Sequence, residues 1–276
     1  MMDLSSQLDL PTITTNIFIV GTLLYLMVHN VPVLHFFLMH VKTQRRHATK
    51  GDHREVATKN TFTVPKSYFL HFYVLSSTIT IFTLATKFIN NKTSPPVPSF
   101  VASLLLLSHL TRRAMECLFV HVWKPTSRMH VLSYLGAISY YTLVVLVVLQ
   151  VGTNGREPDP VLAFAGVLMC LYGQYEQYQH HVLLADLGRN RKLTNDNHYT
   201  VPSRRWFTVV ACPHYFAEIL IYIGFAFVLQ TIPCVAMVGF VVCNLSVAAL
   251  ATHEFYTKNI PEYASSGRRA IIPYLL

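Results

Sequence analysis

Long apolar stretches recur along nearly the whole of this 276-residue chain and restrict what it can fold into. A helix needs about 20 largely apolar residues to cross the hydrocarbon core of a membrane. Seven stretches meet this requirement, at residues 14–41, 67–90, 98–122, 131–151, 160–184, 209–230 and 232–256. The break between the last two is short, so six spans are the alternative. With 52% hydrophobic and 13% charged residues, the composition indicates an all-α integral membrane protein rather than a soluble domain.

Basic residues give the chain a net charge of +9, and they are concentrated in three segments outside the apolar stretches. The segment 42–66 carries seven Lys and Arg residues, and the segments 186–206 and 265–276 are also basic. Cytosolic segments of membrane proteins are enriched in Lys and Arg. Seven spans therefore predict a lumenal N-terminus and a cytosolic C-terminus. The charge is explained by this topology, and we expect no binding of nucleic acid.

Ionisable side chains inside apolar spans are costly, and they usually pair with each other or line a cavity. Here they gather near the predicted cytosolic ends of four spans. In the third span, His109 and Arg113 are four residues apart, as are Arg112 and Glu116. The later spans contribute Gln174, Gln177 and His181, then His214, Glu218 and Tyr222, and finally Asn244, His253 and Tyr256. Each pair could be an ordinary interhelical hydrogen bond. Together they predict a cytosol-facing cavity for an anionic cofactor, because arginine suits phosphate.

Several common site motifs are absent from the sequence. There is no GxGxxG or GxxxxGK[ST] phosphate loop, no GxSxG nucleophile motif and no HExxH zinc motif. The five cysteines are scattered without metal-ligand spacing. The sequence therefore predicts neither a Rossmann-type cofactor domain nor a metal centre.

Four stretches carry a family resemblance. They are "FTVPKSYFLHFYVLSS" (62–77), "LTRRAMECLFVHVW" (110–123), "PHYFAEILIY" (213–222) and "THEFYTKNIPEYASSGRRAIIPYLL" (252–276). Together they resemble the steroid 5α-reductase family, and the first two are most similar to its polyprenol (polyprenal) reductase branch. The resemblance implies a single transmembrane reductase domain over residues 1–276, in the endoplasmic reticulum membrane. About seven helices would enclose a cytosol-facing NADPH cavity, formed mostly by residues 98–276.

The resemblance also implies roles for individual residues. The residues expected to contact NADPH are Arg113, His181, Arg189, Tyr199, His214, Glu218, Asn244, His253 and Tyr256. Some of them depart from the family pattern. His181 stands where steroid reductases carry an acid, and His214 stands where they have Asn. The loop "LADLGRNRK" leaves Arg191 and Lys192 as alternatives to Arg189.

The polyprenyl branch saturates the α-isoprene double bond of a long polyprenyl lipid, in dolichol synthesis for protein N-glycosylation. Hydride addition to an isolated allylic alcohol would develop negative charge with no acceptor, whereas an aldehyde delocalises that charge onto oxygen. We therefore expect polyprenal as the substrate and dolichal as the product. His71 and Tyr73 of "LHFY", together with Glu116, are the candidate catalytic residues that would polarise the carbonyl.

Three alternatives stay open at this point. A steroid or enoyl-thioester reductase of the same family would share the fold. A membrane methyltransferase of the isoprenylcysteine or phospholipid type would use S-adenosylmethionine, which lacks phosphates and leaves the excess of arginine unexplained. A lipid-binding or scaffolding protein would bind no nucleotide. The expected partners are the polyprenyl substrate and membrane lipids, while lipid chain length and oligomeric state are left open.

Overall fold

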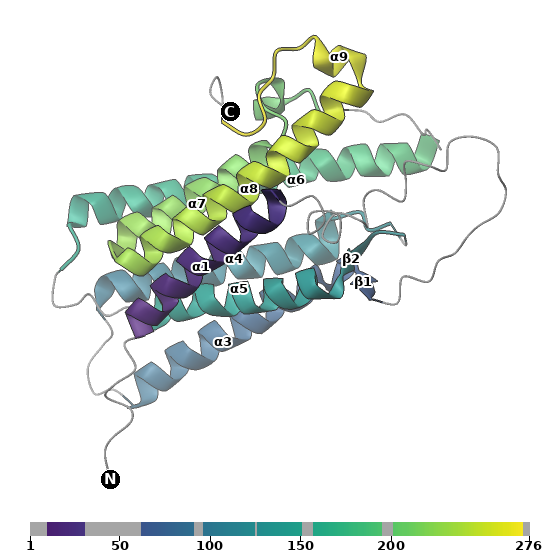
Figure 1. The fold of residues 1–276 in the computed structure, drawn as a ribbon. Helices are drawn as coiled ribbons and strands as arrows, with labels where there is room; N and C mark the ends of the chain where they lie inside the picture. The colour runs from purple at the N-terminus through teal and green to yellow at the C-terminus, as the bar shows by residue number, and fades with distance from the viewer. Residues whose placement is uncertain are drawn as a thin grey trace.

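Every predicted span contains an α-helix in the computed structural model. The structure describes residues 10–30, 62–90, 96–124, 126–150, 157–194 and 201–272. The helices are α1 (Leu10–Asn30), α3 (Phe69–Asn90), α4 (Val97–Met115), α5 (Val131–Gln150), α6 (Pro160–Thr194), α7 (Pro213–Leu229), α8 (Ile232–Asn259) and the short α9 (Pro261–Ala264). The long helices form an elongated bundle, and the end of α6 extends beyond most of the others (Figure 1). The predicted all-α class is confirmed.

Some helix boundaries differ from the predicted spans. Helix α6 continues well past residue 184, to Thr194. Helix α7 begins at Pro213 rather than at 209, because the preceding residues form a short 3-10 helix, η4 (Arg205–Thr208), and proline favours the first turn of a helix. Gln230 ends α7 in a left-handed conformation, with φ of 51°, so α7 and α8 are two separate helices. Residues 31–41 of the first predicted span lie outside the described residues.

The distribution of side chains fits a membrane environment. Among the described residues, the helical segments that are long and apolar enough to cross a membrane are Lys66–Ile89, Val131–Leu149 and Ile232–Asn259. Shorter apolar helices cover Leu10–Thr22 and Pro213–Leu229. Phe82 and Val161 are 68% and 77% exposed, whereas His109, Glu116 and His180 are buried. Soluble proteins show the opposite preference. The chain is therefore a membrane protein, and seven spans stay a prediction.

Helix α4 lies at the centre of the bundle, where it packs against α3, α5, α6 and α7. Its end passes directly into a π-helical turn, η3 (Glu116–Val120), which the sequence did not predict. Helix α8 packs against α1, α5 and α7 on one side of this arrangement. Because π-helical turns are rare and frequently occur at functional sites, the junction of α4 and η3 is a candidate functional site.

A small antiparallel strand pair adds to the helical fold and was also not predicted. Strand β1 (Thr63–Pro65) precedes the 3-10 helix η2 (Lys66–Tyr68) and pairs with β2 (Arg128–His130). The Arg128 guanidinium donates to the side-chain oxygen of Thr63 at 2.7 Å. Since β1 and η2 lead into α3 and β2 leads into α5, the pair ties the starts of these two helices together.

Glycines allow α6 and α7 to approach each other closely. A Cβ atom at Gly166 would lie 2.7 Å from the carbonyl oxygen of Gly224. A Cβ atom at Gly173 would lie 2.9 Å from the carbonyl oxygen of Ala217 and 2.9 Å from Cγ1 of Ile221. Small residues at helix crossings are a common means of packing membrane helices. The close approach brings the polar faces of α6 and α7 together.

We predict that Gly173→Ala destabilises the protein, because its added methyl group would overlap the α7 backbone. Overpacking of this kind typically costs about 1–3 kcal/mol. Gly239→Ala on α8 is the matched control, since a Cβ there meets nothing within 4 Å and alanine favours a helix by about 0.5–1 kcal/mol. Thermal unfolding in detergent should give a lower Tm for Gly173→Ala and an unchanged or higher Tm for the control. Equal Tm values would contradict the close packing.

Candidate active site

A buried ion-pair cluster lies where α4 passes into η3. Glu116 is 1% exposed and accepts hydrogen bonds from Arg112 and Arg113, which lie four and three residues earlier. Arg112 also contacts Nδ1 of His109 at 3.2 Å. The arginine side chains are themselves only 18% and 12% exposed. Because water is largely excluded, charges in this cluster interact more strongly than they would at a surface.

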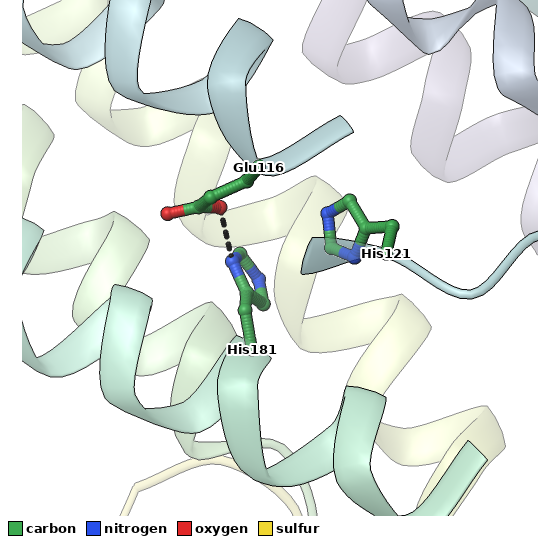
Figure 2. A group of neighbouring side chains, drawn as sticks. All are labelled: Glu116, His121 and His181. Atoms are coloured by element: carbon green, nitrogen blue, oxygen red, sulfur yellow. Dashed lines mark hydrogen bonds and ion pairs between the residues drawn. The ribbon is translucent and has the colours of Figure 1, made fainter. Parts of the chain in front are cut away.

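His181 of α6 points toward Glu116, as Figure 2 shows. Its Nδ1 lies 2.7 Å from a Glu116 carboxylate oxygen and 2.7 Å from the Arg113 guanidinium. His121, which follows η3, lies beside it with ring centroids 5.2 Å apart. Glu116, His121 and His181 offer potential metal-ligand atoms within 4.8 Å of one another. A cation there would face two guanidinium groups on the same carboxylate, and their charge disfavours it.

Helix α7 joins the cluster through Glu218. Gln177, one turn before His181 on α6, accepts a hydrogen bond from Arg112 and donates one to Glu218. Glu218 also lies 3.6 Å from Nε2 of His109. The polar groups that the sequence showed in three separate spans therefore form one network, which we call the α4 network.

Tyr73 of α3 completes the α4 network from the other side. Arg113 donates to the Tyr73 hydroxyl oxygen at 3.1 Å, and its guanidinium lies 5.1 Å from the centroid of the Tyr73 ring. Tyr73 is buried, and the hydroxyl of Tyr141 on α5 approaches the same oxygen at 3.4 Å. Helices α3, α4, α5, α6 and α7 thus all contribute to the α4 network.

The α4 network is balanced in formal charge when its histidines are neutral. It holds two guanidinium groups and two carboxylates: Glu116 pairs with both Arg112 and Arg113, and Glu218 joins through Gln177 and His109. Binding a phosphate calls for positive charge that is not already paired. A tyrosine hydroxyl held beside an arginine is instead suited to a carbonyl oxygen on which negative charge develops.

His214, in the first turn of α7, lies next to the α4 network. Its ring centroid is 5.6 Å from that of His181 and 6.2 Å from that of Phe207. Its Nδ1 is buried and has no hydrogen-bond partner among the described residues. Most buried nitrogens in proteins are hydrogen-bonded. His214 therefore offers a hydrogen-bonding position that a ligand could fill.

Several predicted site residues are not joined to the α4 network by the described contacts, and His71, Asn244 and Tyr199 are three of them. His71 is exposed on α3, and its Nδ1 lies 3.0 Å from the hydroxyl of Tyr134 on α5. Asn244 is half-buried on α8. Tyr199 lies outside the described residues. Their roles stay predictions.

His253 and Tyr256 belong to a second polar group at the end of α8. The hydroxyl of Tyr263, in α9, lies 2.7 Å from Nδ1 of His253, and its ring packs 5.1 Å from that of Tyr256. Burial is the main cause that raises the pKa of Tyr263 to about 12. Its hydroxyl therefore stays protonated at neutral pH and can donate to His253. Arg268 lies 5.6 Å from the Tyr263 ring centroid and donates to the carbonyl oxygen of Pro202 at 2.8 Å.

Basic residues gather around the segment between α6 and α7. Arg205 pairs with Glu176 at 2.6 Å, and this hydrogen bond is the main cause that raises the pKa of the arginine. The backbone of Arg269 forms a parallel bridge with Val210, which brings the C-terminal segment to the same place. The side chains of Arg204 and Arg269 are exposed. The surface around this segment therefore carries positive charge next to the buried polar residues.

Arg189 has a local role in the structure. It pairs with Asp186 at 2.8 Å and donates to the carbonyl oxygen of Val120 at 3.1 Å. These contacts hold the end of α6 against the end of η3, and its predicted contact with NADPH stays a prediction.

Four members of the α4 network were not among the predicted site residues. The sequence placed His109, Arg112 and Gln177 in the polar clusters that predict a cavity, but it assigned them no role and did not show which of these residues contact each other. Tyr141 gave a weaker signal, because tyrosines are common in membrane helices. Its spacing of seven residues from Tyr134 places both on one face of α5, and that pattern could have identified it.

Comparison with known proteins identifies the family. Residues 128–276 match the family model described as 3-oxo-5-alpha-steroid 4-dehydrogenase. A polyprenal reductase of Homo sapiens is 30% identical over 82% of this chain and 82% of its own length. The polyprenal reductase of Saccharomyces cerevisiae is 29% identical over 87% and 86%, and polyprenal reductase 1 of Oryza sativa is 27% identical over 79% and 81%. These matches show that the chain belongs to the 3-oxo-5-alpha-steroid 4-dehydrogenase family of oxidoreductases.

Proposed function

We propose that this membrane oxidoreductase reduces polyprenal to dolichal with NADPH, as a step of dolichol synthesis. The names of its relatives in animals, fungi and plants support the substrate. The observation that carries the proposal is the buried hydroxyl of Tyr73, which Arg113 holds within the α4 network. A donor in that environment suits the oxygen of an α,β-unsaturated aldehyde, where charge develops during reduction.

The chain's contribution to the reaction is to hold the aldehyde and stabilise its oxygen. NADPH, when bound, supplies a hydride for the β-carbon of the conjugated double bond. Tyr73 donates a hydrogen bond to the aldehyde oxygen, on which negative charge develops as the conjugated π electrons shift to give the enolate. Arg113 supports this charge through Tyr73, and Glu116 keeps Arg113 in place. A proton from water then adds to the α-carbon and leaves the saturated aldehyde. One preorganised donor typically contributes roughly 3–4 kcal/mol to such a step.

His214, beside the α4 network, and Glu218, a member of it, would hold the nicotinamide end of NADPH. A nicotinamide carries a carboxamide with both donors and an acceptor, and the buried, unpartnered Nδ1 of His214 offers it a hydrogen bond. Glu218, four residues later on the same helix face, can accept from its NH₂ group. The phosphates need positive charge, which the exposed Arg204 and Arg269 supply at the edge of the structure. Tyr199, which lies outside the described residues, stays a predicted contact of the nucleotide.

The proposal is tested by NADPH oxidation with the purified protein in detergent. Separate reactions contain polyprenal, polyprenol, an enone steroid, an enoyl thioester or no substrate. We expect oxidation with polyprenal, with dolichal as the product. Oxidation with the steroid or the thioester alone would assign a different member of the family. If the protein does not bind NADPH and instead turns over S-adenosylmethionine, the proposal is contradicted.

We predict that Glu218→Ala weakens NADPH binding. A hydrogen bond to a charged group typically contributes about 1.5–3 kcal/mol, which corresponds to about a tenfold to hundredfold rise in the Kd. Glu157→Ala is the control, because Glu157 is exposed just before α6 and lies outside the α4 network. Titration of NADPH fluorescence with each purified variant measures the Kd. An unchanged Kd and turnover for Glu218→Ala would remove Glu218 from the cofactor site.

We further propose that the protein lies in the endoplasmic reticulum membrane with its N-terminus in the lumen. The basic segments 186–206 and 265–276 then face the cytosol, where NADPH is available. A protease added to intact microsomes should remove an epitope tag from the C-terminus and leave an N-terminal tag protected. The reverse pattern would contradict this topology.

A further inference from the structure

Helix α5 presents two tyrosines to α3, and each contacts one of the predicted catalytic residues. Tyr134 and Tyr141 are seven residues apart, about two helical turns, so they lie on the same face. The Tyr134 hydroxyl lies 3.0 Å from Nδ1 of His71. The Tyr141 hydroxyl lies 3.4 Å from the hydroxyl of Tyr73. Of these two contacts, the one at Tyr73 belongs to the α4 network.

Ring packing fixes the position of the Tyr141 side chain. Its ring stacks on Phe72, with centroids 6.1 Å apart and an interplanar angle of 17°. It meets the rings of Tyr73 and Tyr140 edge-on, at 5.1 Å in both cases. The pairing of β1 with β2 also ties α3 to α5. Phenylalanine at position 141 would keep all of these ring contacts, so the hydroxyl oxygen can be tested separately from the packing.

The direction of the hydrogen bond between Tyr141 and Tyr73 determines whether the Tyr73 proton is free for a substrate. A tyrosine hydroxyl has one proton to donate and two lone pairs that can accept. Arg113 can only donate, so it occupies one lone pair of the Tyr73 oxygen. If Tyr141 donates to the second lone pair, the Tyr73 proton stays free for a substrate. If Tyr73 instead donates to Tyr141, that proton is already used.

We infer that Tyr141 is a positioning residue, whose hydroxyl donates to Tyr73 and so directs the proton of Tyr73 to the aldehyde oxygen. The inference rests on the proposed function, because it assigns a partner to the donor proposed there. Two donors on one phenol oxygen also favour the negative charge that this oxygen gains when its proton shifts toward the substrate. Tyr141 does not need to touch the substrate itself.

The first test compares Tyr141→Phe with the matched control Tyr140→Phe. The neighbouring Tyr140 is also packed among aromatic rings but is not hydrogen-bonded to Tyr73 in the structure. We expect Tyr141→Phe to lower kcat with polyprenal by about fivefold to tenfold, because one neutral hydrogen bond at a long distance is lost. Its Tm and its KM for NADPH should match those of the wild type. Tyr140→Phe should keep kcat within about twofold, and equal kcat values for the two variants would overturn the inference.

A double-mutant cycle shows whether Tyr141 acts through Tyr73. Residues that act as one unit give effects that do not add. The double variant Tyr73→Phe/Tyr141→Phe should therefore be no slower than Tyr73→Phe alone. Losses that multiply would mean that Tyr141 acts independently, and would overturn the inference. A larger loss of kcat from Tyr134→Phe than from Tyr141→Phe would place the donor at His71 and would also overturn it.

Turnover by the wild-type protein distinguishes a failure of the proposed function from a failure of the role of Tyr141. If it does not reduce polyprenal with NADPH, the proposed function and the inference both fail. If it does, and Tyr141→Phe is as fast as the wild type, only the role of Tyr141 fails.

Discussion

Substituting Glu116 by glutamine is expected to cause the largest loss of stability of any single change in the α4 network. Glutamine keeps the shape of the side chain but removes the negative charge that Arg112 and Arg113 share. It would leave two guanidinium groups close together in a site with little access to water. Breaking a buried ion pair by removing one partner typically costs about 3–5 kcal/mol.

The effect of Glu116→Gln is measured by thermal unfolding in detergent and by NADPH oxidation with polyprenal. We expect a markedly lower Tm and a loss of activity of at least about a hundredfold. Glu254→Gln is the matched control, because the Glu254–Lys258 pair is more than 60% exposed and such pairs contribute about 0–1 kcal/mol. Equal Tm values for the two variants would show that the α4 network is not an important source of stability.

Substituting Tyr73 by phenylalanine is expected to cause the largest specific loss of catalysis. The change removes one oxygen atom and leaves the ring over which the Arg113 guanidinium lies. Loss of a preorganised donor to a developing oxyanion typically lowers kcat by about 10²–10³. NADPH binding should be unaffected, because Tyr73 contacts the substrate end of the proposed site. The measurement is kcat together with the Kd for NADPH.

Tyr178→Phe is the control for the Tyr73 variant. Tyr178 lies on α6 near His181, but its side chain is exposed. Its substitution should leave kcat unchanged. If Tyr73→Phe keeps wild-type kcat while His71→Ala loses activity, the donor to the aldehyde is His71 instead. In that case the exposed face of α3, rather than the α4 network, would be the place of catalysis.

The helical fold was largely predictable, because apolar stretches of about 20 residues leave a chain few alternatives in a membrane. Every predicted span contains a helix. The π-helical turn at Glu116–Val120 was not predictable, since a single extra residue in a turn leaves no change in the apolar pattern. The β1–β2 pair also gave no signal, because strands of three residues are too short to show an alternation.

The candidate site was predictable in its residue types but not in its connections. Arg113 and Glu116 pair because they lie three residues apart on the chain, where α4 passes into η3. His181 reaches them because α6 packs against α4 and η3, and the spacing of residues along one helix did not predict that contact. His253 and Tyr256 shared a helix face with other polar residues, yet they group with Tyr263, which lies beyond the end of α8. Spacing within one helix shows which face a residue occupies, but it does not show which other helix that face meets.

The most direct test of the proposed reaction follows the hydride itself. The purified protein is given polyprenal and NADPH that carries deuterium at both C4 positions of the nicotinamide, and the product is analysed by mass spectrometry and NMR. We expect dolichal with one deuterium on the β-carbon and a solvent proton on the α-carbon. Deuterium on the carbonyl carbon, with the double bond intact, would show that the enzyme reduces the aldehyde group instead and would contradict the proposed reaction.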